Sequence, residues 1–180
     1  MLIQLTGLSG AGKTTVAHAT QELWPYPGIP FTIIDGDVYR RTICSDLGFS
    51  KEDRCENIRR LGKIAFNTVS PNTTDGIPGI AIIAAINPYN SIRQELKNRY
   101  QARTVWIHCP IEELRSRDTK GLYHRALLPD GDAGKVYNLS GVNDPYEAPE
   151  DADLVIHTSN ETVTESAEKL LYFILDNLSF

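Results

Sequence analysis

The sequence predicts a three-layer α/β fold, in which a five-stranded parallel sheet is covered by helices on both faces. Five short apolar segments recur along the 180 residues, and each is followed by a segment with helical spacing of its apolar residues. This alternation is typical of parallel sheets, because a parallel connection needs a crossover that a helix usually supplies. The strands are expected near residues 2, 31, 80, 104 and 153, and we expect one domain over residues 1–180.

The first strand and helix flank the most specific motif of the chain. Residues 7–15 read GLSGAGKTT, which fits the pattern glycine, four residues, glycine, lysine and then serine or threonine. The glycines fall at a strand-to-helix turn, where backbone N–H groups and a helix N-terminus together favour an anion. An ordinary glycine-rich turn would need neither the lysine nor the hydroxyl that follows it. The expected nucleotide-binding residues are Gly7, Ser9, Gly10, Ala11, Gly12, Lys13, Thr14 and Thr15.

This motif predicts a P-loop, and with it the P-loop NTPase fold. Lys13 is expected to reach the β- and γ-phosphates of ATP, and the Thr14 hydroxyl is expected to bind Mg²⁺. The motif therefore predicts phosphoryl transfer with ATP as co-substrate. The size of the chain, together with the lid expected at residues 118–150, favours a small-molecule kinase over a GTPase.

The second strand, residues 31–34, leads directly into two carboxylates. Asp35 and Asp37 follow it, and open parallel sheets place their ligands at the carboxyl ends of such strands. Asp35 is therefore a candidate for ordering Mg²⁺ or the acceptor hydroxyl. The alternative is that Asp37 simply caps the helix that follows, and such a structural role is open to either aspartate taken alone.

A helix is expected after Ser50, which we interpret as its N-cap, with Asp53 in the place of the usual Glu of a capping box. Arg54 and Asn57 lie one turn apart on a shared side of this helix. Surface arginines are commonly solvated, so a ligand role for Arg54 depends on the preceding loop facing the nucleotide. The stripe predicted to face the core comprises Ile58, Leu61, Ala65 and Val69.

The second half of the chain continues the alternation. Residues 71–75 form a polar gap before the next strand. We interpret His108 as a packed or hydrogen-bonded residue rather than a catalyst. The helix opened by Pro110 has acidic residues first and basic residues later, as a helix dipole prefers. The expected strands cover residues 79–86, 104–109 and 153–156, and the expected helices residues 92–99, 110–117 and 163–178.

Residues 118–150 lack any periodicity. A stretch of this length inside a compact domain is either disordered or a functional lid. Its tyrosines, Tyr123, Tyr137 and Tyr146, and its basic residues favour the lid.

The composition narrows the possible partners and the compartment. Lys and Arg number 18 against 23 Asp and Glu, a net charge of −5, which argues against a general nucleic-acid binder. Cys44, Cys55 and Cys109 show no metal-binding spacing, so reduced thiols are expected. The sequence shows no signal peptide and no membrane span, so we expect a cytoplasmic protein without a membrane partner.

Several segments together resemble the adenylylsulfate kinase (APS kinase) family, which phosphorylates the 3′-hydroxyl of adenosine 5′-phosphosulfate (APS) in sulfate assimilation. They follow the order of the family and as a set are much more specific than the P-loop. The matching segments are residues 7–15, Asp35-Gly-Asp37 with Arg40, residues 46–50, Asp53-Arg54 with residues 56–60, residues 87–89, Arg117-Asp118 with residues 120–123, and residues 144–149.

The resemblance assigns roles to these residues. It implies Lys13, Asp35 and Asp37 as catalytic residues, Thr14 and Asp35 as Mg²⁺ ligands, and Arg117 near the ATP adenine. Phe49 is implied to stack on the substrate base, with Leu139 on its other side, while arginines meet the phosphosulfate. The implied substrate-binding residues are Asp37, Arg40, Phe49, Arg54, Asn57, Ile86, Asn87, Lys120, Leu139 and Ser140.

The chain departs from the family pattern in three respects. Asn87 stands where many members have a serine that can be phosphorylated, so direct in-line transfer without a phosphoserine is expected. Leu139 replaces a frequent phenylalanine, which leaves one aliphatic wall around the base. The chain starts at the first strand, without a segment that contributes to dimer contacts in the family, which weakens the expectation of a homodimer.

Two other functions stay open at this point. The first is a P-loop kinase of another small nucleotide-like hydroxyl substrate. The second is a nucleotide-sensing regulatory domain without activity, which the presence of Lys13, Thr14 and Asp35 disfavours.

Overall fold

The computed structural model describes residues 1–69 and 79–178, and the polar gap predicted at residues 71–75 lies outside these ranges. Its sheet has five strands in the order β2-β3-β1-β4-β5, and every neighbouring pair is parallel. The predicted sheet is therefore confirmed. The strands are β1 (Leu2–Thr6), β2 (Phe31–Asp35), β3 (Ile80–Ala84), β4 (Arg103–His108) and β5 (Leu154–His157).

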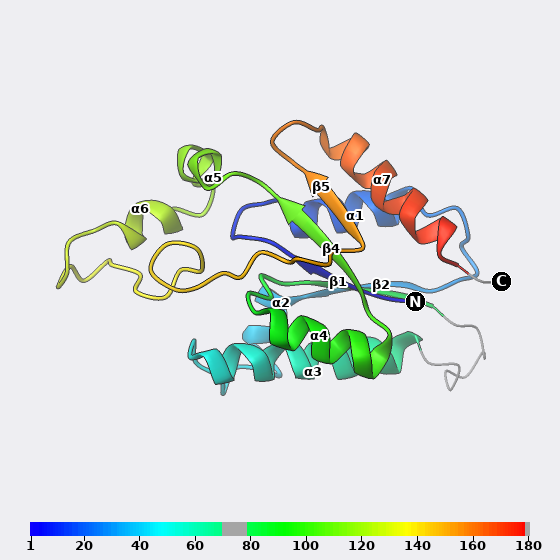
Figure 1. The fold of residues 1–180 in the computed structure, drawn as a ribbon, viewed down its shortest axis with the longest axis horizontal. Coiled ribbons are helices and arrows are strands. Elements are labelled where there is room, and N and C mark those ends of the chain that lie inside the picture. The colour runs from blue at the N-terminus through cyan, green and yellow to red at the C-terminus, as the bar shows by residue number, and fades with distance from the viewer. Residues whose placement is uncertain (70–78, 179–180) are drawn as a thin grey trace.

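Helices cover both faces of the sheet, which gives the three layers of the predicted fold (Figure 1). Helices α1 and α7 pack together on one face, and α3 and α4 pack together on the other. The helices are α1 (Lys13–Glu22), α2 (Gly36–Arg40), α3 (Lys51–Val69), α4 (Asn90–Tyr100), α5 (Ile111–Arg117), α6 (Leu122–Ala126) and α7 (Val163–Asp176).

Each face of the sheet has its own apolar core. Ile3 and Leu5 of β1 belong to the core under α1 and α7, whereas Leu2 belongs to the core under α3 and α4. Side chains alternate along a strand, so Gln4 and Thr6 share the face of Leu2. Both are fully buried, which places polar groups inside the second core.

Two predicted helix starts have different outcomes. Ser50 Oγ accepts from the backbone N–H of Asp53 at 3.1 Å, which confirms the cap of α3. The cap of α2 is Asp35, whose Oδ1 accepts from the backbone N–H groups of Asp37 and Val38 at 2.8 and 3.3 Å. The capping role considered for Asp37 therefore belongs to the residue two positions earlier, because the helix begins directly where the strand ends.

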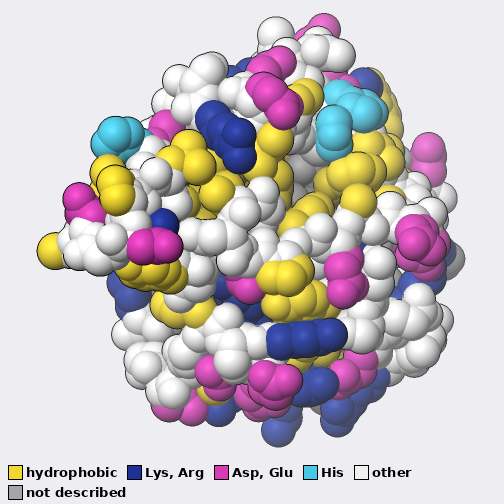
Figure 2. Space-filling model, turned by 60° about the vertical axis from the view of Figure 1, so that its left-hand side comes forward, with side chains coloured by type: hydrophobic (Ala, Val, Ile, Leu, Met, Phe, Trp, Pro, Cys, Tyr) yellow, Lys and Arg dark blue, Asp and Glu magenta, His cyan; other side chains and the backbone are white. Residues whose placement is uncertain are grey.

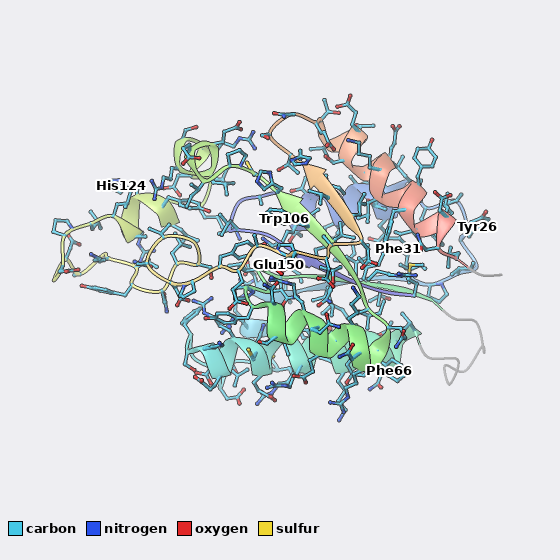
Figure 3. All side chains as sticks on the ribbon, viewed as in Figure 1. Tyr26, Phe31, Phe66, Trp106, His124 and Glu150 are labelled. Atoms are coloured by element: carbon cyan, nitrogen blue, oxygen red, sulfur yellow. The ribbon has the colours of Figure 1, made fainter. Side chains whose placement is uncertain are left out.

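Residues 118–150 are folded onto the carboxyl ends of the strands. They contain α6 and a bridge between Ser140 and Asp144, and the chain then returns along the sheet to β5 (Figure 1). In Figure 3, His124 of α6 lies at this end of the molecule, whereas Tyr26 and Phe66 lie at the opposite end. The segment thus gathers at the end of the sheet where the P-loop also lies.

The remaining composition-based predictions concern cysteines and membranes. Cys44, Cys55 and Cys109 are buried free thiols, as expected. Among the residues that the structure describes, no helix is both long and apolar enough to cross a bilayer.

Candidate active site

A cavity of about 800 Å³ opens at the carboxyl ends of the strands. The P-loop and Asp35 form one part of its wall, and residues of α2, of the carboxyl end of β3, of α3 and of the 118–150 segment form most of the rest. Figure 2 shows this side of the molecule turned toward the viewer, with apolar side chains near the centre of a hollowed face and many acidic ones toward its outline. The volume is sufficient for a small-molecule ligand.

The P-loop needs glycine at residue 7 for a steric reason. Gly7 has φ of +153°, and a Cβ there would lie 2.3 Å from the carbonyl oxygen of Ile107 on the neighbouring strand. Gly12, with φ of +94°, is the cap of α1 and also adopts a conformation that favours glycine. These two glycines allow the loop to pass close to β4 and then to enter the helix.

Lys13 lies folded back over the loop. Its Nζ donates to the carbonyl oxygens of Gly7 and Leu8 at 2.9 and 2.8 Å, and its side chain is buried. Burial lowers the pKa of Lys13 to about 8, against the opposing effect of Asp37. The ammonium is thus weakly solvated and is ready to exchange carbonyl partners for an anion.

Thr14 and Asp35, the two residues expected to bind Mg²⁺, lie in direct contact. The Thr14 hydroxyl donates to Asp35 Oδ2 at 2.8 Å, while Asp35 Oδ1 holds the start of α2. The two side chains therefore offer hard oxygen atoms beside the P-loop. Mg²⁺ is usually held by one or two protein oxygens together with phosphates and water, and this pair fits that requirement.

In the part of the chain that the structure describes, no larger metal site competes with this pair. Within residues 1–69 and 79–178, no three His, Cys, Asp or Glu side chains are grouped closely enough to hold an ion.

Asp37 pairs with a residue from the 118–150 segment. Lys120 Nζ lies 2.7 Å from Asp37 Oδ2. Burial alone would raise the pKa of Asp37, but the hydrogen bond and charge of Lys120 outweigh burial and hold that pKa below its usual value. This ion pair joins the end of β2 to the segment above it, so both predicted residues border the same space.

The other end of the cavity combines an aromatic ring with two guanidinium groups. The Phe49 ring is half exposed, and the Arg40 and Arg54 guanidinium carbons lie 4.8 and 5.4 Å from its centre. Burial and the charge of Arg54 lower the pKa of Arg40. An anion bound here would relieve this repulsion, and the ring offers a surface on which a flat base can stack.

Arg54 is buried and paired, unlike a solvated surface arginine. It is 5% exposed, and its guanidinium forms an ion pair with Asp144 at 2.6 Å. It also donates to the Asn138 carbonyl at 2.6 Å and to Ser140 Oγ at 3.2 Å. Arg54 therefore fastens α3 to the 118–150 segment at the edge of the cavity.

Asn57 and Asn87 bring amide groups to the cavity. Both are buried, and the Oδ1 atoms of both lack a hydrogen-bond partner. Ile86, which precedes Asn87, accepts from the Gly7 N–H at 3.2 Å and from the Thr6 hydroxyl at 2.9 Å through its carbonyl oxygen. The strand end after β3 is thus tied directly to the P-loop.

The 118–150 segment forms the far wall. Leu139 and Ser140 are buried, and both line the cavity. Tyr123 of α6 donates its hydroxyl to the carbonyl oxygen of Ser9 at 2.8 Å, and burial raises the pKa of Tyr123 to about 12. This contact anchors the segment on the P-loop.

The structure thus brings together most of the predicted site residues. All of them line the main cavity except Gly7, Ala11 and Arg117. Arg117 pairs with Glu113 at 2.8 Å and borders a smaller cavity next to the P-loop instead. His108 lies outside the main cavity, with its Nδ1 3.2 Å from the Nδ1 of His157, which confirms that it is hydrogen-bonded.

Sequence reasoning missed the partners that hold these residues in place. Asp144 and Asn138 hold Arg54, and Arg93 donates to the Asn87 carbonyl oxygen at 2.5 Å. For Asp144 the sequence offered one signal of a role at the site, which is that this charged residue lies within a segment that resembles the family. For Arg93 the sequence offered no such signal. It is one of several basic residues on α4, and the others are more exposed.

The fold and the site define a P-loop domain of the α/β class, in which the P-loop and an aromatic ring flanked by two guanidinium groups line one cavity. Its sequence matches the family described as adenylylsulphate kinase over residues 1–157. The chain belongs to this family.

Individual relatives agree with this membership. An adenylyl-sulfate kinase of Picosynechococcus sp. is 41% identical over 170 residues, covering 94% of this chain and 90% of the relative. One from Rippkaea orientalis is 40% identical, with coverage of 93% and 87%. The structure of the Mycobacterium tuberculosis APS kinase in complex with AMPPNP and APS is 28% identical, has a TM-score of 0.79 and covers 97% of this chain and 98% of its own.

Proposed function

We propose that this protein is an adenylylsulfate kinase, which transfers the γ-phosphoryl group of ATP to the 3′-hydroxyl of adenosine 5′-phosphosulfate. The observation that carries the proposal is the single cavity that joins the P-loop to the ring of Phe49 and the guanidinium groups beside it. A donor phosphate chain and an acceptor nucleotide need these two ends. Family membership supports the choice of this acceptor.

The donor end would hold ATP through the P-loop. Lys13 would leave the Gly7 and Leu8 carbonyl groups for the β- and γ-phosphates. Thr14 and Asp35 would hold Mg²⁺, which offsets charge on the phosphates when it is bound. Arg117 would lie near the ATP adenine.

The acceptor end would hold APS. Phe49 and Leu139 would enclose the adenine, and Arg40 and Arg54 would face the phosphosulfate. Asp37, Asn57, Ile86, Asn87, Lys120 and Ser140 complete the proposed set of substrate-binding residues.

The acceptor hydroxyl would attack the γ-phosphorus in line with the leaving oxygen. Asp35 would orient this hydroxyl or the water around Mg²⁺, since positioning supplies most of the catalysis in phosphoryl transfer. Asn87 has no hydroxyl that could carry a phosphoryl group, so transfer would be direct.

The 118–150 segment would act as a lid. Its contacts with the P-loop through Tyr123, with α3 through Arg54 and with Asp37 through Lys120 support this role. Closure over the substrates would exclude water, which competes with the acceptor hydroxyl for the phosphoryl group.

A coupled assay of ADP release tests the proposal with APS, adenosine, AMP and shikimate as acceptors. We expect turnover with APS to exceed turnover with each of the others by orders of magnitude. Equal rates with AMP would show that the phosphosulfate is not recognised. Binding of ATP without turnover on any acceptor would instead favour a nucleotide sensor.

A further inference from the structure

A layer of buried polar side chains is hydrogen-bonded to Asn87, which lines the cavity. Gln4 and Thr6 of β1, Thr104 of β4 and Arg93 of α4 are each at most 4% exposed. Buried polar groups in a central strand are destabilising unless they are hydrogen-bonded. The hydrogen bonds within this layer therefore indicate how each polar group is oriented.

Gln4 has a single possible orientation. Its Nε2 donates to the Arg93 carbonyl oxygen at 2.9 Å and to Thr104 Oγ1 at 2.9 Å. A main-chain carbonyl can only accept, so the amide nitrogen of Gln4 must face Arg93. The Oε1 atom of Gln4 consequently faces Asn87.

This orientation in turn fixes Asn87. The Nδ2 of Asn87 donates to Gln4 Oε1 at 3.0 Å. A flipped Asn87 amide would bring two acceptor oxygens together, which is repulsive in a dry interior. The Oδ1 of Asn87 is therefore the free end of the amide, and it is an acceptor.

The backbone of Asn87 is also held. Its φ is +47°, a conformation that asparagine tolerates better than most residues. Its carbonyl oxygen accepts from the Thr6 hydroxyl at 3.0 Å and from Arg93 at 2.5 Å. The side-chain amide and the backbone of Asn87 are thus both fixed in the protein without ligand.

The Oδ1 of Asn87 is an unsatisfied acceptor in a residue that lines the cavity. Asn87 is 1% exposed, and its Oδ1 has no hydrogen-bond partner. A buried acceptor without a partner costs free energy, which a donor from a bound molecule would recover. Groups that only accept, such as phosphate and sulfate oxygens, would be repelled.

We propose that Gln4 is a positioning residue, which turns the Asn87 amide so that its Oδ1 accepts a hydrogen bond from a nonreacting donor of the acceptor nucleotide. The donor is either the 2′-hydroxyl of the ribose or the 6-amino group of the adenine, both of which carry a polar hydrogen. This inference rests on the proposed function. It adds a residue outside the cavity to the recognition of the substrate.

The first test replaces Gln4 by methionine, which keeps an unbranched side chain of similar length without the amide. We expect the KM for APS to rise about fivefold in Gln4→Met, while the KM for ATP stays unchanged, because only the acceptor contact is released. Thr104→Val is the matched control. It removes one partner of Gln4 but leaves the Arg93 carbonyl to orient it, so both KM values should stay near wild type. An unchanged KM for APS in folded Gln4→Met, equal changes for both substrates, or an equal shift in Thr104→Val would overturn the inference.

A second test does not depend on the folding of Gln4→Met. The wild-type protein is assayed with APS, with 2′-deoxy-APS and with an analogue that lacks the 6-amino group. One analogue should lose about fivefold in kcat/KM, which identifies the donor. Glycine readily adopts the positive φ of residue 87. Asn87→Gly should therefore remove the difference in kcat/KM between APS and this analogue.

The outcomes separate the two proposals. If both analogues match APS in the wild-type protein, or if Asn87→Gly still discriminates between them, the role of Asn87 and Gln4 is wrong. Failure of the wild-type protein to phosphorylate APS at all would instead refute the proposed function.

Discussion

Lys13 should make nucleotide affinity depend on pH in the alkaline range. Burial lowers the pKa of Lys13 to about 8 in the protein without nucleotide. Phosphate oxygens next to the ammonium stabilise its charged form, so bound ATP raises this pKa. Binding above pH 8 must then take up a proton, and affinity should be highest below pH 8 and fall as the pH rises.

The magnitude follows from the protonated fraction. One pH unit above the pKa, about one tenth of Lys13 is still charged, so the apparent affinity at about pH 9 should be about tenfold lower than at about pH 7, which is about 1.4 kcal/mol. The charges of Asp37 and Lys120 act on Lys13 with opposite sign, and burial has the largest effect.

Isothermal titration calorimetry with a nonhydrolysable ATP analogue measures this effect from about pH 7.5 to about 9.5. Repeating the titration in buffers of different ionisation enthalpy counts the protons taken up. Lys13→Met is the control, and its weaker binding should not change over this range. A flat affinity and no proton uptake in the wild-type protein would refute the reasoning from burial.

Three substitutions test the site and its supports. Asp35→Asn keeps the acceptor that caps α2 but loses the charge, so kcat should fall by about 100-fold without loss of thermal stability. Gly7→Ala places a Cβ 2.3 Å from the Ile107 carbonyl oxygen and should lower the free energy of unfolding in urea by about 3 kcal/mol. Arg54→Met leaves Asp144 without its cation and should also cost about 3 kcal/mol in urea.

Matched variants separate these effects from general damage. Asp35→Ala should lose the cap as well, about 1 kcal/mol. Gly28→Ala meets no atom within 4 Å and should be nearly neutral. Arg59→Met breaks an exposed pair with Glu95 and should cost less than about 1 kcal/mol. A fully active Asp35→Asn, a Gly7→Ala as stable as Gly28→Ala, or equal losses in the two arginine variants would contradict the respective account.

Local sequence patterns were sufficient to predict most of the fold and the P-loop. The P-loop depends on glycines, a lysine and a threonine within nine consecutive residues, and a strand and helix on either side complete it. Five apolar segments, each followed by a helical pattern, were sufficient to predict five parallel strands. The acceptor residues needed the family resemblance, because nothing in the spacing of Arg40, Phe49 and Asn57 identifies a substrate.

The supports of the site could not be predicted, because their partners are distant in the chain. The ion pair from Arg54 to Asp144 and the hydrogen bond from Asn87 to Gln4 each join segments more than eighty positions apart. Gln4 lies within an apolar strand, where a single polar residue reads as an interruption of the pattern. The lid, the homodimer and the cytoplasmic location stay predictions.

The most direct test of the central claim is mass spectrometry of the products after incubation with ATP, Mg²⁺ and APS. We predict a new nucleotide heavier than APS by one phosphoryl group, with fragmentation that places the group on the 3′-oxygen, and an equal amount of ADP. ADP without this nucleotide, or phosphorylation of AMP and APS to the same extent, would contradict the account.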